Sequence, residues 1–281
     1  MTLLFHAFSD STLLILISHL LFANPQTTPH EADDFATSGA YHILYCNANS
    51  TTIPQAAYLQ ALLPTTWAYI QDLLQDIILG TASPHGYAAF FKTNSDLEAV
   101  RQIYQDIADG PDVFASAGPG HPSRLTPPAI LCANPGEPDT VLQQESCNDP
   151  MGFGRTVAGV ARHSGIVHLC PIFFRLPRVP RRGACPRVDR ATNRFEVGDN
   201  GLELGRNQFA ILVHELAHVY LAERGLGGQE EVYGIQGTVE ISASASLENA
   251  QNYGFYAAGE FPVRKQSFDA GLKIKRLRGE S

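Results

Sequence analysis

The chain has 281 residues, of which 44% are hydrophobic and 17% are charged. This length and composition can bury a sizeable core in one domain with extensions. The formal net charge is -8 at pH 7, and an acidic chain of this kind has little general affinity for nucleic acid. Nucleic acid is therefore excluded from the expected partners.

The N-terminal segment has the features of a secretory signal peptide. Residues 13–23 form an apolar stretch of suitable length, which is too short and too interrupted by polar residues to cross a membrane. The stretch before it contains Asp10 and no Lys or Arg, so a buried N-terminal helix is the alternative. We favour a signal peptide over residues 1–23 and an extended lead-in over 24–40. This predicts a secreted protein that has no membrane association once the signal peptide is removed.

The periodicity of apolar residues predicts the first elements of the domain. Residues 54–78 have helical spacing, and Pro64 within them is expected to kink or divide the helix. A second helix is predicted over residues 95–108. Residues 110–160 are rich in Gly, Pro, Asp and Asn, which favours loops and short strands. A strand that ends in a turn is predicted within residues 165–174.

The cysteine pattern indicates disulfides. The chain has five cysteines, namely Cys46, Cys132, Cys147, Cys170 and Cys185. No two of them form a C-x-x-C pair, so zinc binding by cysteine is not expected. Wide spacing behind a signal-like segment is typical of disulfide-bonded proteins from an oxidising compartment, and the odd number leaves one cysteine without an intrachain partner.

An H-E-x-x-H motif at residues 214–218 lies inside the apolar run 209–222, which predicts a helix. On a helix, His214 and His218 share one face and can bind the same metal ion. In this motif Glu215 takes a proton from metal-bound water. A buried helix that carries these residues without metal is the alternative, but buried His and Glu cost free energy unless they are paired or metal-bound. We therefore predict one zinc ion (Zn2+) per chain.

The position of the third zinc ligand distinguishes the families of metallopeptidase. The metzincin pattern needs Gly and His where Leu221 and Arg224 stand, so it does not apply. A thermolysin-like site would take a Glu from a second helix roughly twenty residues further on, and Glu240 fits that spacing. The loop directly after the helix offers Glu230 and Glu231 instead.

Three segments carry a resemblance to a known family. Residues 227–234 read GGQEEVYG and resemble the G-T-x-D-x-x-Y-G loop of the deuterolysins, or aspzincins, a family of fungal zinc metalloendopeptidases. Residues 249–257 resemble the family's closing helix, and residues 166–174 resemble its strand and cysteine before the zinc helix. The resemblance covers a domain of residues 41–262, which leaves 263–281 as a basic C-terminal tail.

The resemblance implies a fold and a set of site residues. The fold would be α+β, a mainly helical zincin-type metallopeptidase fold with a small β-sheet. Zinc would be held by His214, His218 and Glu230, which stands at the position of the family's Asp, although Glu231 remains open as the ligand. Tyr233 would donate a hydrogen bond to the oxyanion of the tetrahedral intermediate.

The resulting expectation is a secreted, monomeric, zinc-dependent endopeptidase that acts on protein or peptide substrates, with Glu215 as general base. Two acids of the closing helix receive the substrate lysine in the family's lysine-specific branch. Gln251 and Gly254 stand there, so lysine preference is not expected. The changed third ligand motivates an alternative, a secreted zinc-binding or host-interaction protein with lost or weak peptidase activity.

The resemblance also implies the disulfide pairing. Cys46 would pair with Cys132, and Cys147 would pair with Cys170. Cys185 would then be the odd cysteine.

Overall fold

The computed structural model describes residues 41–46, 55–79, 84–92, 97–110, 129–133, 141–147, 157–161, 165–180, 187–189, 194–196, 204–226 and 230–260. Contacts divide the chain into residues 1–32 and 33–281, and all described residues belong to the second unit. The expected signal peptide (1–23), lead-in (24–40) and basic tail (263–281) lie outside the described residues.

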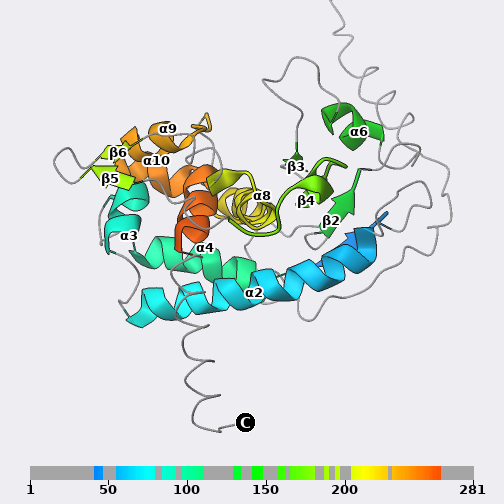
Figure 1. Cartoon of the computed structure of the whole chain (residues 1–281), viewed down its shortest axis with the longest axis horizontal. Coiled ribbons are helices and arrows are strands. Elements are labelled where there is room, and N and C mark those ends of the chain that lie inside the picture. The colour runs from blue at the N-terminus through cyan, green and yellow to red at the C-terminus, as the bar shows by residue number, and fades with distance from the viewer. Residues whose placement is uncertain are drawn as a thin grey trace, which may run out of the picture. The chain divides into compact units, whose positions relative to one another are not determined.

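The described elements form a mixed α+β fold that is mainly helical, as predicted (Figure 1). In chain order they are β1 (His42–Leu44), α2 (Gln55–Leu79), α3 (Pro84–Phe91), α4 (Leu97–Asp109), β2 (Ala129–Cys132), α6 (Val141–Cys147), β3 (Ala158–Ala161), β4 (Ile166–Leu169), the 3-10 turn η3 (Phe173–Arg175), β5 (Arg187–Asp189), β6 (Arg194–Glu196), α8 (Gln208–Glu223), α9 (Ile235–Glu240) and α10 (Ala243–Glu248). Residues 250–260 form a further helix.

Four short strands make the small sheet, in the order β1-β2-β4-β3. Strands β1, β2 and β4 run parallel, and β3 is antiparallel to β4. The predicted strand within 165–174 is confirmed as β4, which is followed by η3. The segment 110–160 contains β2 and β3 as expected, and it also contains helix α6.

The two helices predicted from apolar periodicity are present as α2 and α4. Helix α2 continues through Pro64, so the expected division does not occur. Pro64 and Gln60 are both exposed. Proline has no backbone N–H, so the carbonyl of Gln60, four residues earlier, lacks the usual helical hydrogen bond. The proline therefore lies on the solvent side of α2, where an unpaired carbonyl costs less than it would in the core. Within the described ranges, none of the helices combines the length and apolar character that a bilayer crossing would require.

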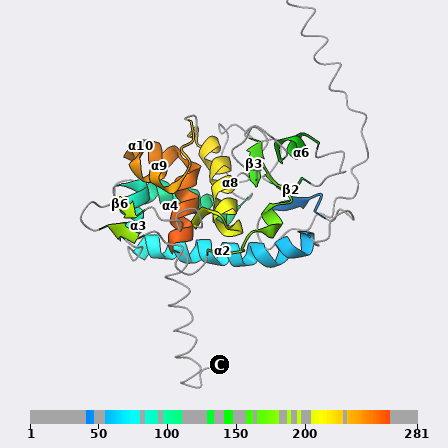
Figure 2. The ribbon, with the colours of Figure 1, turned by 45° about the horizontal axis from the view of Figure 1, so that its top comes forward.

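Helix α8 lies at the centre of the fold. It packs against α4 and against β3 and β4, and it separates the small sheet from α3, α9 and α10 (Figures 1 and 2). Its apolar residues are accordingly buried on most sides, as expected for a helix in the middle of a core; they include Leu212, Val213, Leu216, Ala217, Val219 and Leu221. The two histidines therefore project from a rigid element.

Two disulfides lie at the sheet, in the pairing that the family resemblance implied. Cys46, just after β1, bonds to Cys132 at the end of β2. Cys147 at the end of α6 bonds to Cys170 directly after β4. Cys185 lies outside the described residues.

Candidate metal centre

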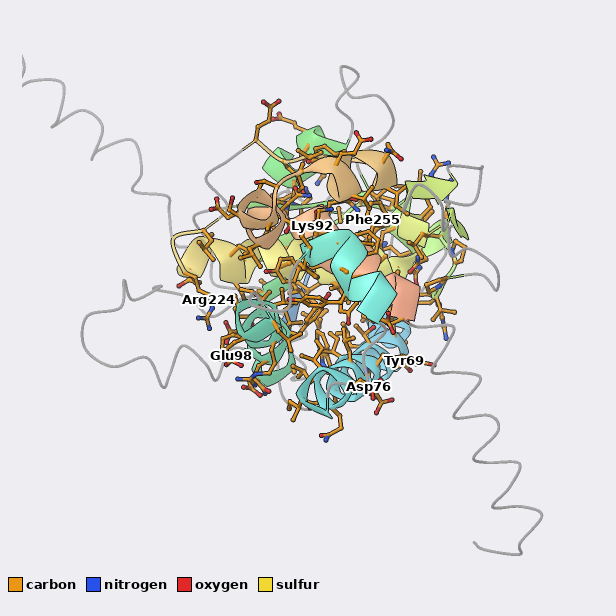
Figure 3. All side chains as sticks on the ribbon, turned by 90° about the vertical axis from the view of Figure 1, so that its left-hand side faces the viewer. Tyr69, Asp76, Lys92, Glu98, Arg224 and Phe255 are labelled. Atoms are coloured by element: carbon orange, nitrogen blue, oxygen red, sulfur yellow. A yellow bond between two sulfur atoms is a disulfide. The ribbon has the colours of Figure 1, made fainter. Side chains whose placement is uncertain are left out.

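Both ends of α8 are fixed by specific contacts. At the start, Asn207 has extended backbone, and its side-chain oxygen accepts the amide hydrogen of Ala210 at 2.9 Å. At the end, Gly225 has a φ of +70°, a conformation that favours glycine after a helix. Arg224 donates two hydrogen bonds to Oδ2 of buried Asp106 on α4, at 2.8 and 2.5 Å (Figure 3). The helix that carries the histidines thus has a fixed position.

The H-E-x-x-H motif lies on α8 as predicted, and its two histidines are neighbours on one face. Their ring centroids are 4.8 Å apart, with the rings nearly perpendicular. Nε2 of His214 lies 3.8 Å from Oε1 of Glu215, whose side chain is buried. The motif therefore presents two imidazole nitrogens and one carboxylate within a small volume.

The carboxylate of Glu231 completes this cluster. Its Oε2 lies 3.1 Å from Nε2 of His218, and its Oε1 lies 3.5 Å from Nε2 of His214. One ligand atom from each of the three side chains lies within 4.8 Å of the others. Oε1 of Glu231 is buried and has no hydrogen-bond partner among the described residues. An unsatisfied buried oxygen of this kind is expected where a cation binds.

The third acid differs from the one expected. Glu230 is exposed, whereas Glu231 meets the two histidines in the place expected for Glu230. Neighbouring residues of a segment that is neither helix nor strand point in different directions, so only one of these two acids can face the site. Glu240, the thermolysin-like candidate, is also exposed at the end of α9, where it accepts a hydrogen bond from Gln236.

The ionisation of this cluster favours cation binding. Burial raises the pKa of Glu231, but the hydrogen bond with His218, the nearby histidines and a hydrogen bond with Tyr233 outweigh burial and lower that pKa to about 2. Burial lowers the pKa of His214 to about 4, against an opposing effect of Glu231. At neutral pH the site therefore offers an ionised carboxylate and a neutral imidazole, which are the forms that bind metals.

Glu215 has the opposite shift. Burial raises the pKa of this carboxyl from 4.5 to about 7, His218 opposes the rise, and Glu231 adds to it. A carboxyl with a pKa near neutrality can accept and release a proton at physiological pH. Glu231 and Glu215 are therefore suited to different tasks, although both are acids of the same cluster.

Tyr233 lies at the rim of the cluster. Its side chain is exposed, with a relative exposure of 68%. Its ring centroid is 6.5 Å from that of His214, and it hydrogen-bonds Glu231. An exposed hydroxyl group next to the histidines can reach a molecule that binds there from solvent.

The helix of residues 250–260 packs against α8 at the site. A Cβ atom added to Gly254 would lie 2.8 Å from the carbonyl oxygen of Ala210 and 3.1 Å from Cβ of His214. Gly254 therefore allows the close approach of the two helices. Gln251, one turn earlier, is partly exposed.

The residues present fit a zinc ion. For metal–ligand bonds of about 2.0–2.1 Å in tetrahedral geometry, neighbouring ligand atoms should be roughly 3.3 Å apart. Oε2 of Glu231 lies 3.1 Å from Nε2 of His218 and Oε1 of Glu231 lies 3.5 Å from Nε2 of His214, so each oxygen–nitrogen pair is close to this separation. Two imidazole nitrogens and one carboxylate also form a ligand set of catalytic zinc sites, in which the fourth position is left open.

A second group of potential ligands has a different explanation. Cys147, His168 and Cys170 lie close together, but the two sulfurs form a disulfide and are not thiolates. His168 is buried, and its Nε2 lies 3.2 Å from Oγ of Ser146. We therefore regard this group as structural.

The comparisons with known proteins find similarity among solved structures. No protein-family model matches the sequence, and no curated protein matches it. Among solved structures, the chain is similar to a zinc peptidase from Grifola frondosa, with 17% sequence identity and a TM-score of 0.44. The match covers 75% of this chain and 98% of that chain. Similarity at this level does not assign the chain to a family.

Proposed function

We propose that this protein is a zinc-dependent endopeptidase with one Zn2+ per chain, held by His214, His218 and Glu231. The observation that carries the proposal is the convergence of these three side chains, with Oε1 of Glu215 only 3.8 Å from Nε2 of His214. Metal capture by these three side chains does not require a second, buried acid whose pKa is raised to about 7. Hydrolysis does require one, since a proton must be removed from the attacking water.

The zinc ion, when bound, lowers the pKa of a coordinated water towards neutrality and polarises the substrate carbonyl. Glu215 accepts the proton from the water that attacks the peptide carbonyl carbon. It then delivers this proton to the nitrogen of the leaving amine. Burial raises the pKa of Glu215 to about 7, which suits a carboxyl that accepts and then releases a proton near neutral pH.

Tyr233 is proposed as the donor to the oxyanion. Negative charge develops on the carbonyl oxygen as the tetrahedral intermediate forms, and a positioned hydroxyl stabilises this charge. The exposure of Tyr233 at the rim, beside His214, supports this role because the substrate must approach from that side. The hydrogen bond with Glu231 keeps the hydroxyl close to the site before the substrate binds.

The proposed substrate is a protein or peptide, without a preference for lysine. Gln251 is uncharged, and the contact of Gly254 with α8 leaves no room there for an acidic side chain. We propose that the protein is secreted and acts as a monomer. Two disulfides, together with the apolar stretch 13–23, support an oxidising compartment.

Casein hydrolysis by the purified protein tests the proposal. We expect activity that a chelator abolishes and that added zinc restores. The Glu215→Gln variant should retain zinc, as measured by elemental analysis, but should not hydrolyse casein. Stoichiometric zinc without hydrolysis in the wild-type protein would instead favour a zinc-binding protein that has lost turnover. A protein that binds no zinc would overturn both proposals.

A further inference from the structure

We infer that Asn249 is a positioning residue, which fixes the segment that carries Glu231 and Tyr233 through hydrogen bonds to the backbone of Val232. This inference rests on the proposed function, because it assigns a role to a residue that serves the proposed site without touching substrate or metal.

The segment that carries Glu231 and Tyr233 needs such a contact. Residues 230–233 lie in neither a helix nor a strand. Their backbone is therefore not held by the regular hydrogen bonds of secondary structure. Both Glu231 and Tyr233 nevertheless have to keep a defined distance from α8 if the site is to hold a metal ion and stabilise an oxyanion.

Asn249 supplies the contact through both ends of its side-chain amide. Its Oδ1 accepts the amide hydrogen of Val232 at 3.0 Å, and its Nδ2 donates to the carbonyl oxygen of Val232 at 3.1 Å. Asn249 thus satisfies the backbone donor and acceptor of Val232 in the same way as a neighbouring strand would. Val232 is the residue between Glu231 and Tyr233, so this one side chain holds the backbone between the two.

Asn249 is itself fixed by a second asparagine. The second hydrogen of its Nδ2 is donated to Oδ1 of Asn252 at 2.6 Å. Nδ2 of Asn252 donates in turn to the carbonyl oxygens of Phe90 on α3, at 2.6 Å, and Thr238 on α9, at 3.2 Å. Both asparagines are buried, with exposures of 5% and 0%. Each amide hydrogen and each amide oxygen in this chain of contacts has a partner, so both side chains have a defined orientation.

A lysine connects the same elements. Nζ of Lys92, directly after α3, donates to the carbonyl oxygens of Ala89 and of Val239 on α9 (Figure 3). Helix α9 begins directly after the segment of residues 230–234. The segment is therefore held at Val232 by Asn249, and the helix that follows it is held by Asn252 and Lys92.

Three variants separate this role from general stability. Asn249→Ala removes all contacts of the amide. Asn249→Asp keeps an acceptor for the Val232 amide hydrogen but loses both donated hydrogen bonds. Ser246→Ala is the matched control, because Ser246 is also buried and its Oγ donates to the carbonyl oxygen of Ala243 within α10. Circular dichroism establishes that each variant is folded.

The first measurement is hydrogen exchange at the Val232 amide in metal-free protein, which requires neither activity nor zinc. Loss of a hydrogen bond worth about 1 kcal/mol should speed exchange by roughly fivefold. We expect this increase in Asn249→Ala, a smaller one in Asn249→Asp, and none in Ser246→Ala. Unchanged exchange in Asn249→Ala would overturn the inference.

The second measurement is metal affinity, together with the absorption spectrum of the Co2+-substituted protein. Loss of a group that orients a metal ligand commonly lowers affinity by about 10–100-fold. We expect such a loss and an altered Co2+ spectrum in both Asn249 variants, with neither in Ser246→Ala. Wild-type affinity and spectrum in a folded Asn249→Asp protein would contradict the positioning role. A wild-type chain that binds no metal would overturn the proposed function, whereas the Val232 exchange rates would still decide whether Asn249 holds the segment.

Discussion

His218 on α8 and Glu231 in the following segment are 13 residues apart in sequence, and their side chains meet with Nε2 and Oε2 at 3.1 Å. The other oxygen of the same carboxylate lies 3.5 Å from Nε2 of His214. One carboxylate therefore faces both histidines. This arrangement makes Glu231 the third candidate ligand of the metal centre.

Zinc affinity should depend on Glu231 and not on its acidic neighbours. Loss of a direct ligand should reduce affinity by more than the roughly 10–100-fold that follows loss of an outer partner. We expect this for Glu231→Ala, measured by competition with a chromophoric chelator. Glu230→Ala and Glu240→Ala are the controls and should bind zinc normally, since both side chains are exposed. If Glu230→Ala loses zinc while Glu231→Ala retains it, then Glu230 is the third zinc ligand, as expected from the sequence.

Glu215→Gln should separate metal binding from turnover. The amide has nearly the same size as the carboxyl group but cannot accept the proton from water. We expect zinc content equal to that of the wild type and a kcat lower by about 10²–10⁴-fold. Assays on a fluorogenic peptide would give the rates, and elemental analysis would give the zinc content. Activity within a factor of about three of the wild type would exclude Glu215 as the general base.

The same variant should stabilise the metal-free protein at alkaline pH. Burial raises the pKa of Glu215 from 4.5 to about 7. As the pH rises through this window, the unfolded chain loses the proton first, so the free energy of unfolding falls. The destabilisation that comes from ionising buried Glu215 is fully present above about pH 7, and it is absent below pH 4.5, the ordinary pKa of a Glu carboxyl. Denaturation with urea in the presence of chelator would measure the free energy of unfolding. At pH 8 that of Glu215→Gln should exceed that of the wild type, by on the order of 3 kcal/mol at most. At pH 4 the two proteins should not differ in this way. Equal stability at pH 8 would show that burial does not perturb this carboxyl.

Tyr233→Phe should reduce turnover without loss of zinc. Removal of one donor to an oxyanion typically lowers kcat by about 10²–10³-fold. The exposed side chain contributes little to the core, so the melting temperature should change little. Steady-state kinetics together with thermal denaturation would test both expectations. A wild-type kcat would remove Tyr233 from the mechanism.

Gly254→Ala should disturb the contact between α8 and the helix of residues 250–260. The added methyl group would lie 2.8 Å from the carbonyl oxygen of Ala210 and 3.1 Å from Cβ of His214. We expect a loss of about 1–3 kcal/mol in stability and weaker zinc binding, because His214 has to move. Gly259→Ala is the matched control in the same helix, where a Cβ would meet nothing within 4 Å. It should stabilise the protein slightly, by about 0.4–1 kcal/mol. Chemical denaturation of both variants would reveal the difference.

The sequence determined the features that depend on local spacing. Apolar periodicity located α2 and α4, because side chains that share a helix face must be apolar if that face is buried. The spacing of His214 and His218 placed both imidazoles on one face of α8, because the helical repeat alone decides this. The resemblance of three segments to a known family added the pairing of Cys46 with Cys132 and of Cys147 with Cys170.

Only the tertiary structure decided the features that depend on contacts between distant segments. The continuity of α2 at Pro64 depended on which side of the helix faces solvent. Which of Glu230 and Glu231 lies beside the histidines depended on the direction of two adjacent side chains in a segment without regular structure. No pattern in the sequence fixes that direction, because this segment contacts distant parts of the chain, as in the hydrogen bonds between Val232 and Asn249, 17 residues away in sequence. The motif thus placed two candidate ligands on one helix, whereas the packing of the chain brought a third candidate, Glu231, beside them.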